Sequence, residues 1–180
     1  MKYFKIFGSL LIFACLPAGA ADQDVTWSKY SANLRLETFD KDESTAVFIG
    51  HTQLHGRLFF EFDDLGNDTY GDILQAVLVP DSKTASTLPY VSSGYYASKI
   101  KRIFVNNPDD ALVMLVGKEK THQLTDHGNT KELSFDVEIE IKKFVVTIEC
   151  DTREYIATAA TITQPSMKFV GIIDTNRHGC

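Results

Sequence analysis

Cysteine is scarce in this 180-residue chain, which has three, and Cys15 lies within the first 20 residues. No CxxC pair is present, so the sequence lacks the thiolate spacing typical of zinc and redox sites. It also lacks HExxH, G-x-S-x-G and S-x-x-K motifs and any phosphate loop. These absences give no catalytic residue to name, no metal site to assign and no cofactor to expect.

Long apolar runs are confined to the N-terminus, and nothing after residue 20 is apolar enough to cross a membrane. Two lysines precede an apolar run over residues 6–16, and small residues end at Ala20. This layout predicts a signal peptide over residues 1–20 and one mature domain over residues 21–180, in the periplasm or outside the cell. The alternatives are a buried N-terminal helix or lipoprotein processing at Cys15, where the bulky Phe13 fits the signal peptidase poorly.

Positive charge is also in short supply. Lys2 and Lys5 leave with the signal peptide, so the 18 Lys and Arg residues fall to 16 against 24 Asp and Glu residues, a formal charge of −8. Because phosphate contacts need surplus Lys and Arg, this balance argues against nucleic acid as a partner. It is typical of a soluble protein, or of one that attracts a basic protein.

The mature chain retains Cys150 and Cys180. An even pair in an oxidising compartment predicts a disulfide, which would stabilise the fold by roughly 3–4 kcal/mol and hold the polar C-terminal tail. The alternative is a metal-binding or catalytic thiol.

The dominant hydrophobic period is two, which predicts strands bounded by turn residues. The segment Asn106–Asp110 (NNPDD) is typical of a hairpin turn. The one candidate helix covers residues 72–78, which could equally form a strand. The expected strands are residues 33–39, 46–49, 58–62, 100–105, 111–116 and 155–162.

The segment from Leu133 to Tyr155 changes the face that it buries: odd positions are apolar up to Ile141, and even positions follow Lys142 and Lys143. One extra residue reverses strand faces, so we expect a bulge or sharp bend at the lysines, which a tight turn fits less well. The chain is therefore expected to be all-β, or β-rich α+β: a single antiparallel sandwich or half-open barrel with at most one or two short helices.

Four polar patterns are candidate sites. The carboxylates of Asp136, Glu138 and Glu140 share one strand face, either as a cation or basic-protein site or as a solvated face relieved by cross-strand Lys or Arg. His51 and His55 lie about 13 Å apart in an extended strand, too far to share a metal ion. Two loops complete the set. Residues 118–132 include His122 and His127, which would need a third ligand from elsewhere to hold a metal ion. Residues 63–72 (DDLGNDTYGD) resemble a calcium loop only in composition, and the alternative is a solvated turn between strands.

The most distinctive surface segment runs over residues 89–102 and combines tyrosines with cations. Tyrosine offers a large contact area at low entropy cost, and the flanking cations suit an anionic or glycan ligand or a protein partner. The alternative is an ordinary strand entry with tyrosine packed on the core. The candidate binding residues are Tyr90, Tyr95, Tyr96, Lys99, Lys101 and Arg102.

The pattern of a strand ending in Cys150, a further strand and a Cys at position 180 resembles small surface-adhesin E-type envelope proteins, over this segment only. The leading hypothesis is an exported binding module that engages another protein, such as a basic effector or hydrolase that it restrains. The alternatives are a hydrolase whose metal or carboxylate site comes from distant residues, and a lipid-anchored envelope component. The missing motifs favour binding over catalysis.

Overall fold

The computed structural model describes residues 25–62, 73–92, 99–125, 131–149, 152–163 and 172–174. These residues form one mixed sheet of seven strands and three short helices. The strands are β1 (Leu34–Asp40), β2 (Thr45–Phe62), β3 (Ile73–Pro80), β4 (Ile103–Val105), β5 (Lys131–Glu149), β6 (Thr152–Thr163) and β7 (Ile172–Asp174). The helices are α1 (Ser82–Thr87), α2 (Pro108–Val116) and α3 (Lys118–Thr125). The expected β-rich fold is therefore confirmed.

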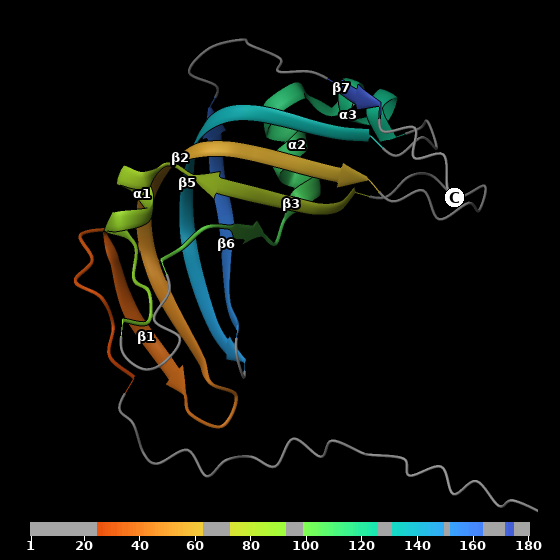
Figure 1. The fold of residues 1–180 in the computed structure, drawn as a ribbon. Helices are drawn as coiled ribbons and strands as arrows, with labels where there is room; N and C mark the ends of the chain where they lie inside the picture. The colour runs from red at the N-terminus through yellow and green to blue at the C-terminus, as the bar shows by residue number, and fades with distance from the viewer. Residues whose placement is uncertain are drawn as a thin grey trace, which may run out of the picture.

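Five of the strands close into a ring. The order β2-β3-β4-β6-β5 returns to β2, because β2 pairs with β5 along almost its whole length. All pairs in the ring are antiparallel except β4 with β6, which is parallel. β1 and β7 add to the ring at β2 and β5, and Figure 1 shows β1 at the end opposite α2 and α3.

A row of half-buried apolar residues on the outer surface demonstrates the closure. Each member lies opposite the next on the neighbouring strand, in the order Val47, Val145, Ile156, Phe104, Val77 and Phe59. The row starts on β2 at Val47 and returns to β2 at Phe59, further along the strand. A closed barrel requires this stagger between its strands. The sheet is thus a small barrel, as one of the two expected architectures had it, but it is closed and not half-open, and it contains one parallel pair that was not expected.

The connectivity of the ring is that of an OB-type barrel: the first strand pairs with the second and the fourth, the third lies parallel to the fifth, and helices join the third to the fourth. This assignment concerns architecture alone, since one fold hosts many unrelated functions. Among the described residues, every helix is too short or too polar to span a bilayer.

The barrel interior is filled by alternating apolar side chains, as the period of two predicted. On β5, Phe135, Val137 and Ile139 point inward, and Phe144 and Val146 take over beyond the lysines. The β5–β6 register shifts between Glu140 and Lys143, and both lysines are exposed. The expected bulge at Lys142 and Lys143 is confirmed. Because of this bulge, one strand of 19 residues buries its odd positions before the lysines and its even positions after them.

Three sequence predictions about elements are wrong. Residues 118–132 are not a loop throughout, because Lys118–Thr125 form the helix α3 and β5 begins at Lys131. Residues 73–80 form the strand β3 and not a helix, because the whole segment pairs with β2. Residues 108–116 form α2, with Asn107 as its N-cap, and not a hairpin turn followed by a strand. Pro108 stands in the first turn with Asp109 and Asp110, which is a helix-start pattern. With α1 and α3 the structure has three helices, one more than the expected maximum.

α2 is joined to the barrel by Asn107, which precedes it. The Asn107 side chain donates to the Ala159 carbonyl oxygen at 3.1 Å and accepts from the Ala159 N–H at 3.0 Å. These bonds continue the parallel pairing of β4 and β6. The buried face of α2 carries Ala111 and Leu112, which close this end of the core.

Candidate functional site

The most distinctive polar feature of the described chain is a gap beside β2. β5 occupies one side of β2 from Thr45 to Glu61. On the other side β1 pairs as far as Gly50, and β3 pairs from Gly56 onward. Between these two glycines, no other strand among the described residues pairs with the side of β2 that faces away from β5, and this stretch forms an open edge within that part of the chain.

One end of the gap is closed by the turn into α1. The His55 carbonyl oxygen accepts from the Asp81 N–H at 2.9 Å, and the His55 N–H donates to Thr84 Oγ1 at 3.1 Å. Asp81 caps α1 by accepting from the Thr84 N–H at 2.6 Å. Thr84 is buried. The cap of α1 therefore replaces the next strand residue and fixes where the open edge begins.

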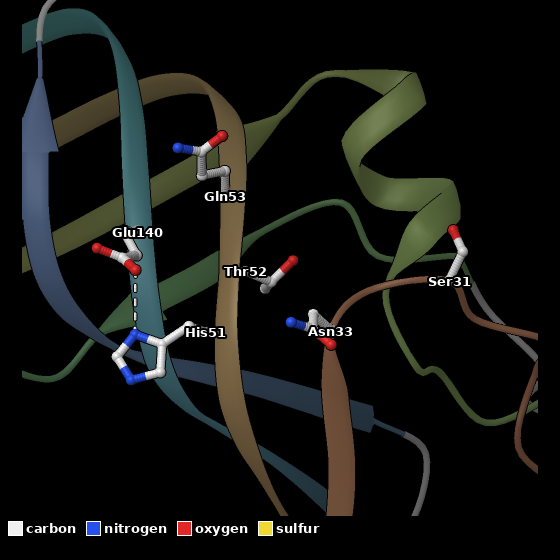
Figure 2. Close-up of a pocket in the computed structure, with 6 residues that line it drawn as sticks. All are labelled: Ser31, Asn33, His51, Thr52, Gln53 and Glu140. Carbon is white, nitrogen blue, oxygen red and sulfur yellow. Dashed lines mark hydrogen bonds and ion pairs between the residues drawn. The ribbon is translucent and has the colours of Figure 1, made fainter.

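A groove of about 390 Å³ opens over the gap. Figure 2 shows side chains from three separate segments around it: the chain entering β1, the open stretch of β2, and β5. All the lining side chains are polar: Ser31, Asn33, His51, Thr52, Gln53 and Glu140. Hydroxyl, amide, imidazole and carboxylate groups together offer both donors and acceptors, so the groove suits a ligand that hydrogen-bonds along its length.

His51 and Glu140 form the charged wall of the groove. His51 Nδ1 lies 3.0 Å from Glu140 Oε1, and Thr161 donates through Oγ1 to Glu140 Oε2 at 3.2 Å (Figure 2 shows the first contact). The His51 side chain is 67% exposed and that of Glu140 36% exposed. Both carboxylate oxygens are thus held, which fixes the direction of the negative charge at the groove.

The carboxylate ladder of β5 continues from this wall. Asp136 Oδ1 accepts from Arg57 Nε at 2.9 Å across the strand pair, with both side chains about half exposed. His55 stands opposite Glu138. The expectation that cross-strand cations relieve the ladder is confirmed for Asp136, and histidines stand opposite or beside the other two carboxylates. Such exposed ion pairs contribute little to the free energy of folding. Their main effect is to reduce the negative electrostatic potential beside the ladder.

Asp81 gives the region a pH dependence. The hydrogen bond from the Thr84 N–H, opposed by desolvation and aided by the Thr84 hydroxyl and His55, lowers the pKa of the Asp81 carboxyl. A carboxyl whose pKa is lower in the folded than in the unfolded state stabilises the protein at any pH above the unfolded pKa of about 4. This stabilisation is lost as the pH falls through the pKa of the folded state.

Asp81→Ala is therefore expected to lower the free energy of unfolding at pH 7 by about 1 kcal/mol, since α1 loses its cap. Asp81→Asn keeps a capping side chain but does not titrate, so its deficit relative to the wild type should shrink between pH 5 and pH 3. Urea unfolding followed by the fluorescence of Trp27, the one tryptophan, measures both effects. A deficit for Asp81→Asn that is independent of pH would show that the Asp81 carboxylate has no special stability in the fold.

The predicted tyrosine site is only partly described. Tyr90 is half-buried and packs against the core. Its N–H donates to Ser28 Oγ at 3.1 Å and its carbonyl oxygen accepts from the Ser28 N–H at 2.8 Å, beside the bridge between Trp27 and Val91. Lys99, Lys101 and Arg102 are exposed, whereas Tyr95 and Tyr96 lie outside the described residues. Partner binding by this segment stays a prediction.

The other predicted sites are mostly beyond the described part of the chain. Residues 63–72, His127, Cys150 and Cys180 all fall outside it, so the calcium loop and the disulfide stay predictions. His122 is exposed on α3, whereas His51 and His55 are on β2. Within the described residues no three His, Cys, Asp or Glu side chains gather as metal ligands would.

Sequence reasoning singled out His51 and Glu140 separately and did not connect them. It missed Ser31, Asn33, Thr52 and Gln53 entirely. Their polar types carry no motif, and only the pairing of β2 with β5, which places Gln53 opposite Glu140, brings the segments together. Comparisons with known proteins give no match, whether with family models, with curated proteins or with solved structures.

Proposed function

We propose that this chain is an exported binding module that holds an extended, basic segment of another protein in the groove beside β2. The observation that carries the proposal is the groove itself: an open stretch of strand edge under a wall of six polar side chains. Its volume of about 390 Å³ is within the usual range for a binding site.

Charge supports a basic ligand. Glu140 lines the groove, and Glu138 follows on the same outer face of β5. The mature chain from residue 21 carries a formal charge of −8, so its long-range field favours approach of a cationic partner. Export and cleavage after Ala20 belong to the same proposal and rest on the N-terminal sequence pattern.

The hydrolase alternative has one feature in its favour, the His51–Glu140 pair. A carboxylate that orients an imidazole is part of many general-base arrangements, and the second nitrogen of the ring is then available to a substrate. A complete site also needs a nucleophile or an activated water held in position by the pair, and the described residues establish neither. Binding is therefore the proposed function.

Three hexapeptides test the proposal: alternating Lys and Val, alternating Gln and Val, and alternating Glu and Val, each capped at both ends. The mature chain is expected to bind the lysine peptide about tenfold more tightly than the glutamate peptide, with the glutamine peptide between them. Raising the salt from 50 to 300 mM should reduce this preference, because the charges are partly exposed. Fluorescence anisotropy of labelled peptides provides the measurement.

Glu140→Gln should remove much of the preference, and adding Glu138→Gln should remove most of it. Glu119→Gln on α3 is the control for each single substitution, because it also removes one negative charge but lies far from the groove, and it should leave the preference intact. Equal affinity for all three peptides, or the same loss in the Glu119→Gln control, would contradict the proposal. Cleavage of the bound peptide would instead support the hydrolase alternative.

A further inference from the structure

We infer that the groove takes its ligand by strand addition: the ligand backbone pairs with the N–H and C=O of Gln53, as a short antiparallel strand between β1 and β3. This inference rests on the proposed function and specifies the mode of binding. Backbone pairing supplies affinity for any extended segment, while the side chains around it supply the choice of sequence.

The direction of the Gln53 backbone follows from the alternation along β2. In an antiparallel strand, the N–H and C=O of one residue point to the same side, and those of the next residue point to the other side. The His55 backbone bonds to Asp81 and Thr84, on the side occupied by β3. Two residues earlier, Gln53 must point to this side too, and within the described part of the chain no residue bonds to its backbone there.

The two described segments that flank Gln53 do not fill the place beside it. β3 ends at Pro80, and Asp81 then begins α1, so the residue that would continue β3 turns away. At the other end, Gly50 allows β1 to approach so closely that a Cβ there would lie 2.1 Å from the Asn33 carbonyl oxygen. Before Leu34 the chain leaves β2 and runs toward α1, where the Ala32 N–H donates to the Thr87 carbonyl oxygen. Both neighbours are thus fixed in place and leave the gap open.

The size and charge of the gap define the ligand. The four residues between Gly50 and His55 span roughly 13 Å of extended chain, enough for three or four ligand residues. A ligand strand antiparallel to β2 has the direction of β1 and β3 and joins them into one continuous edge. Its outward side chain beside Gln53 would lie on the same face as Glu140, two strand spacings or roughly 10 Å away across β2. A long cationic side chain, Lys or Arg, can reach over Gln53 to this carboxylate, so it fits the position.

Substitution of Gln53 separates backbone pairing from side-chain recognition. Gln53→Pro removes the N–H that points into the gap and no bond to β5, and proline is tolerated at such edge positions. It is expected to weaken binding of the lysine hexapeptide by roughly three- to tenfold, the effect of losing one hydrogen bond. Gln53→Ala keeps the backbone N–H and loses only the side chain that lines the groove. The further loss of affinity in Gln53→Pro relative to Gln53→Ala therefore measures the backbone bond.

Peptides methylated on one backbone nitrogen at a time test the same bond with the wild-type chain, so the test survives if the proline variant does not fold. Methylation at one central position is expected to weaken binding as the proline does, and methylation of the nitrogen next to it to have little effect, because strand bonds alternate.

If the lysine peptide binds but neither Gln53→Pro nor methylation affects it, strand addition is wrong and the proposed function remains. If no peptide shows a charge preference, the proposed function fails and the inference fails with it. If sedimentation gives a dimer that the peptide does not dissociate, a second copy of the chain occupies the edge, and the inference is overturned.

Discussion

Replacing Phe48 with alanine is expected to lower the free energy of unfolding by about 3–5 kcal/mol. Phe48 is completely buried, and its ring makes edge-on contacts with Trp27 and Tyr30, at centroid distances of 5.0 and 5.8 Å. A third ring, Phe144 of β5, lies 6.4 Å away and stacks in turn on Tyr155. Since these rings come from β2, β5, β6 and the chain before β1, the cavity left by the substitution cannot close by moving one element.

Chemical denaturation followed by circular dichroism measures this loss, with Trp27 fluorescence as a second probe because the ring touches Phe48. Leu36→Ala is the matched control. Leu36 is also a large apolar residue and stands opposite Phe48 in the β1–β2 pair, but it is 43% exposed, and its loss should cost less than about 0.5 kcal/mol. Similar losses in the two variants would show that the aromatic cluster is not part of the stabilising core.

The sheet was predictable where one face of a strand is buried and the other is solvated. β5 shows this best, because its buried positions alternate on both sides of the lysines, with Val145 the apolar exception on the outer face, and a single reversal of phase can only be a bulge or a turn. The pattern is local and arises from the pleat, so no knowledge of the partner strand is needed to recognise it.

β2 was predictable only in pieces. Its apolar ends were expected as two strands, residues 46–49 and 58–62, whereas the structure joins them in one strand of 18 residues. The middle contains Gly50 and Gly56 and several exposed polar residues, which locally indicate a loop. What makes it a strand is β5, which pairs with it on both sides of an irregularity between Ile49 and Thr52, and long-range pairing cannot be read from one segment.

The error at α2 has a different cause. Asn, Pro and Asp are favoured both in turns and at the start of helices, so Asn107, Pro108 and Asp109 fit either structure. The following run over residues 111–116 is apolar throughout and shows neither period clearly. Tertiary contacts decide: Asn107 bonds to β6, and the helix covers the open end of the core.

The candidate groove shows why sites are harder to predict than strands. It needs the register of β2 against β5, the end of β3 at Pro80 and the entry of β1 at Leu34, three pairings between distant segments. Each lining residue on its own is an ordinary polar residue. The one local signal is weak: the middle of β2 is polar and lies between two glycines, Gly50 and Gly56. This pattern does not reveal that the segment is a strand with an open edge.

Gly50→Ala should have the second large effect, a loss of about 3 kcal/mol or more in the free energy of unfolding. Gly50 has a φ of +146°, a conformation that residues with a Cβ rarely adopt, and this strain alone costs about 1–3 kcal/mol. In addition, the new Cβ would lie 2.1 Å from the Asn33 carbonyl oxygen, so the entry of β1 must move away from β2. Thermal and urea unfolding measure the loss.

Gly117→Ala separates the two causes, because Gly117 also has a positive φ, +83°, but a Cβ there would meet no atom within 4 Å. It should cost only the conformational strain, about 1 kcal/mol. The excess loss at Gly50 then reports the contact with Asn33, which also lines the groove. Gly50→Ala should therefore weaken binding of the lysine peptide even under conditions where it remains folded, and Gly117→Ala should not. Equal losses of stability in the two variants would mean that β1 tolerates displacement, and the groove would then have no fixed wall on that side.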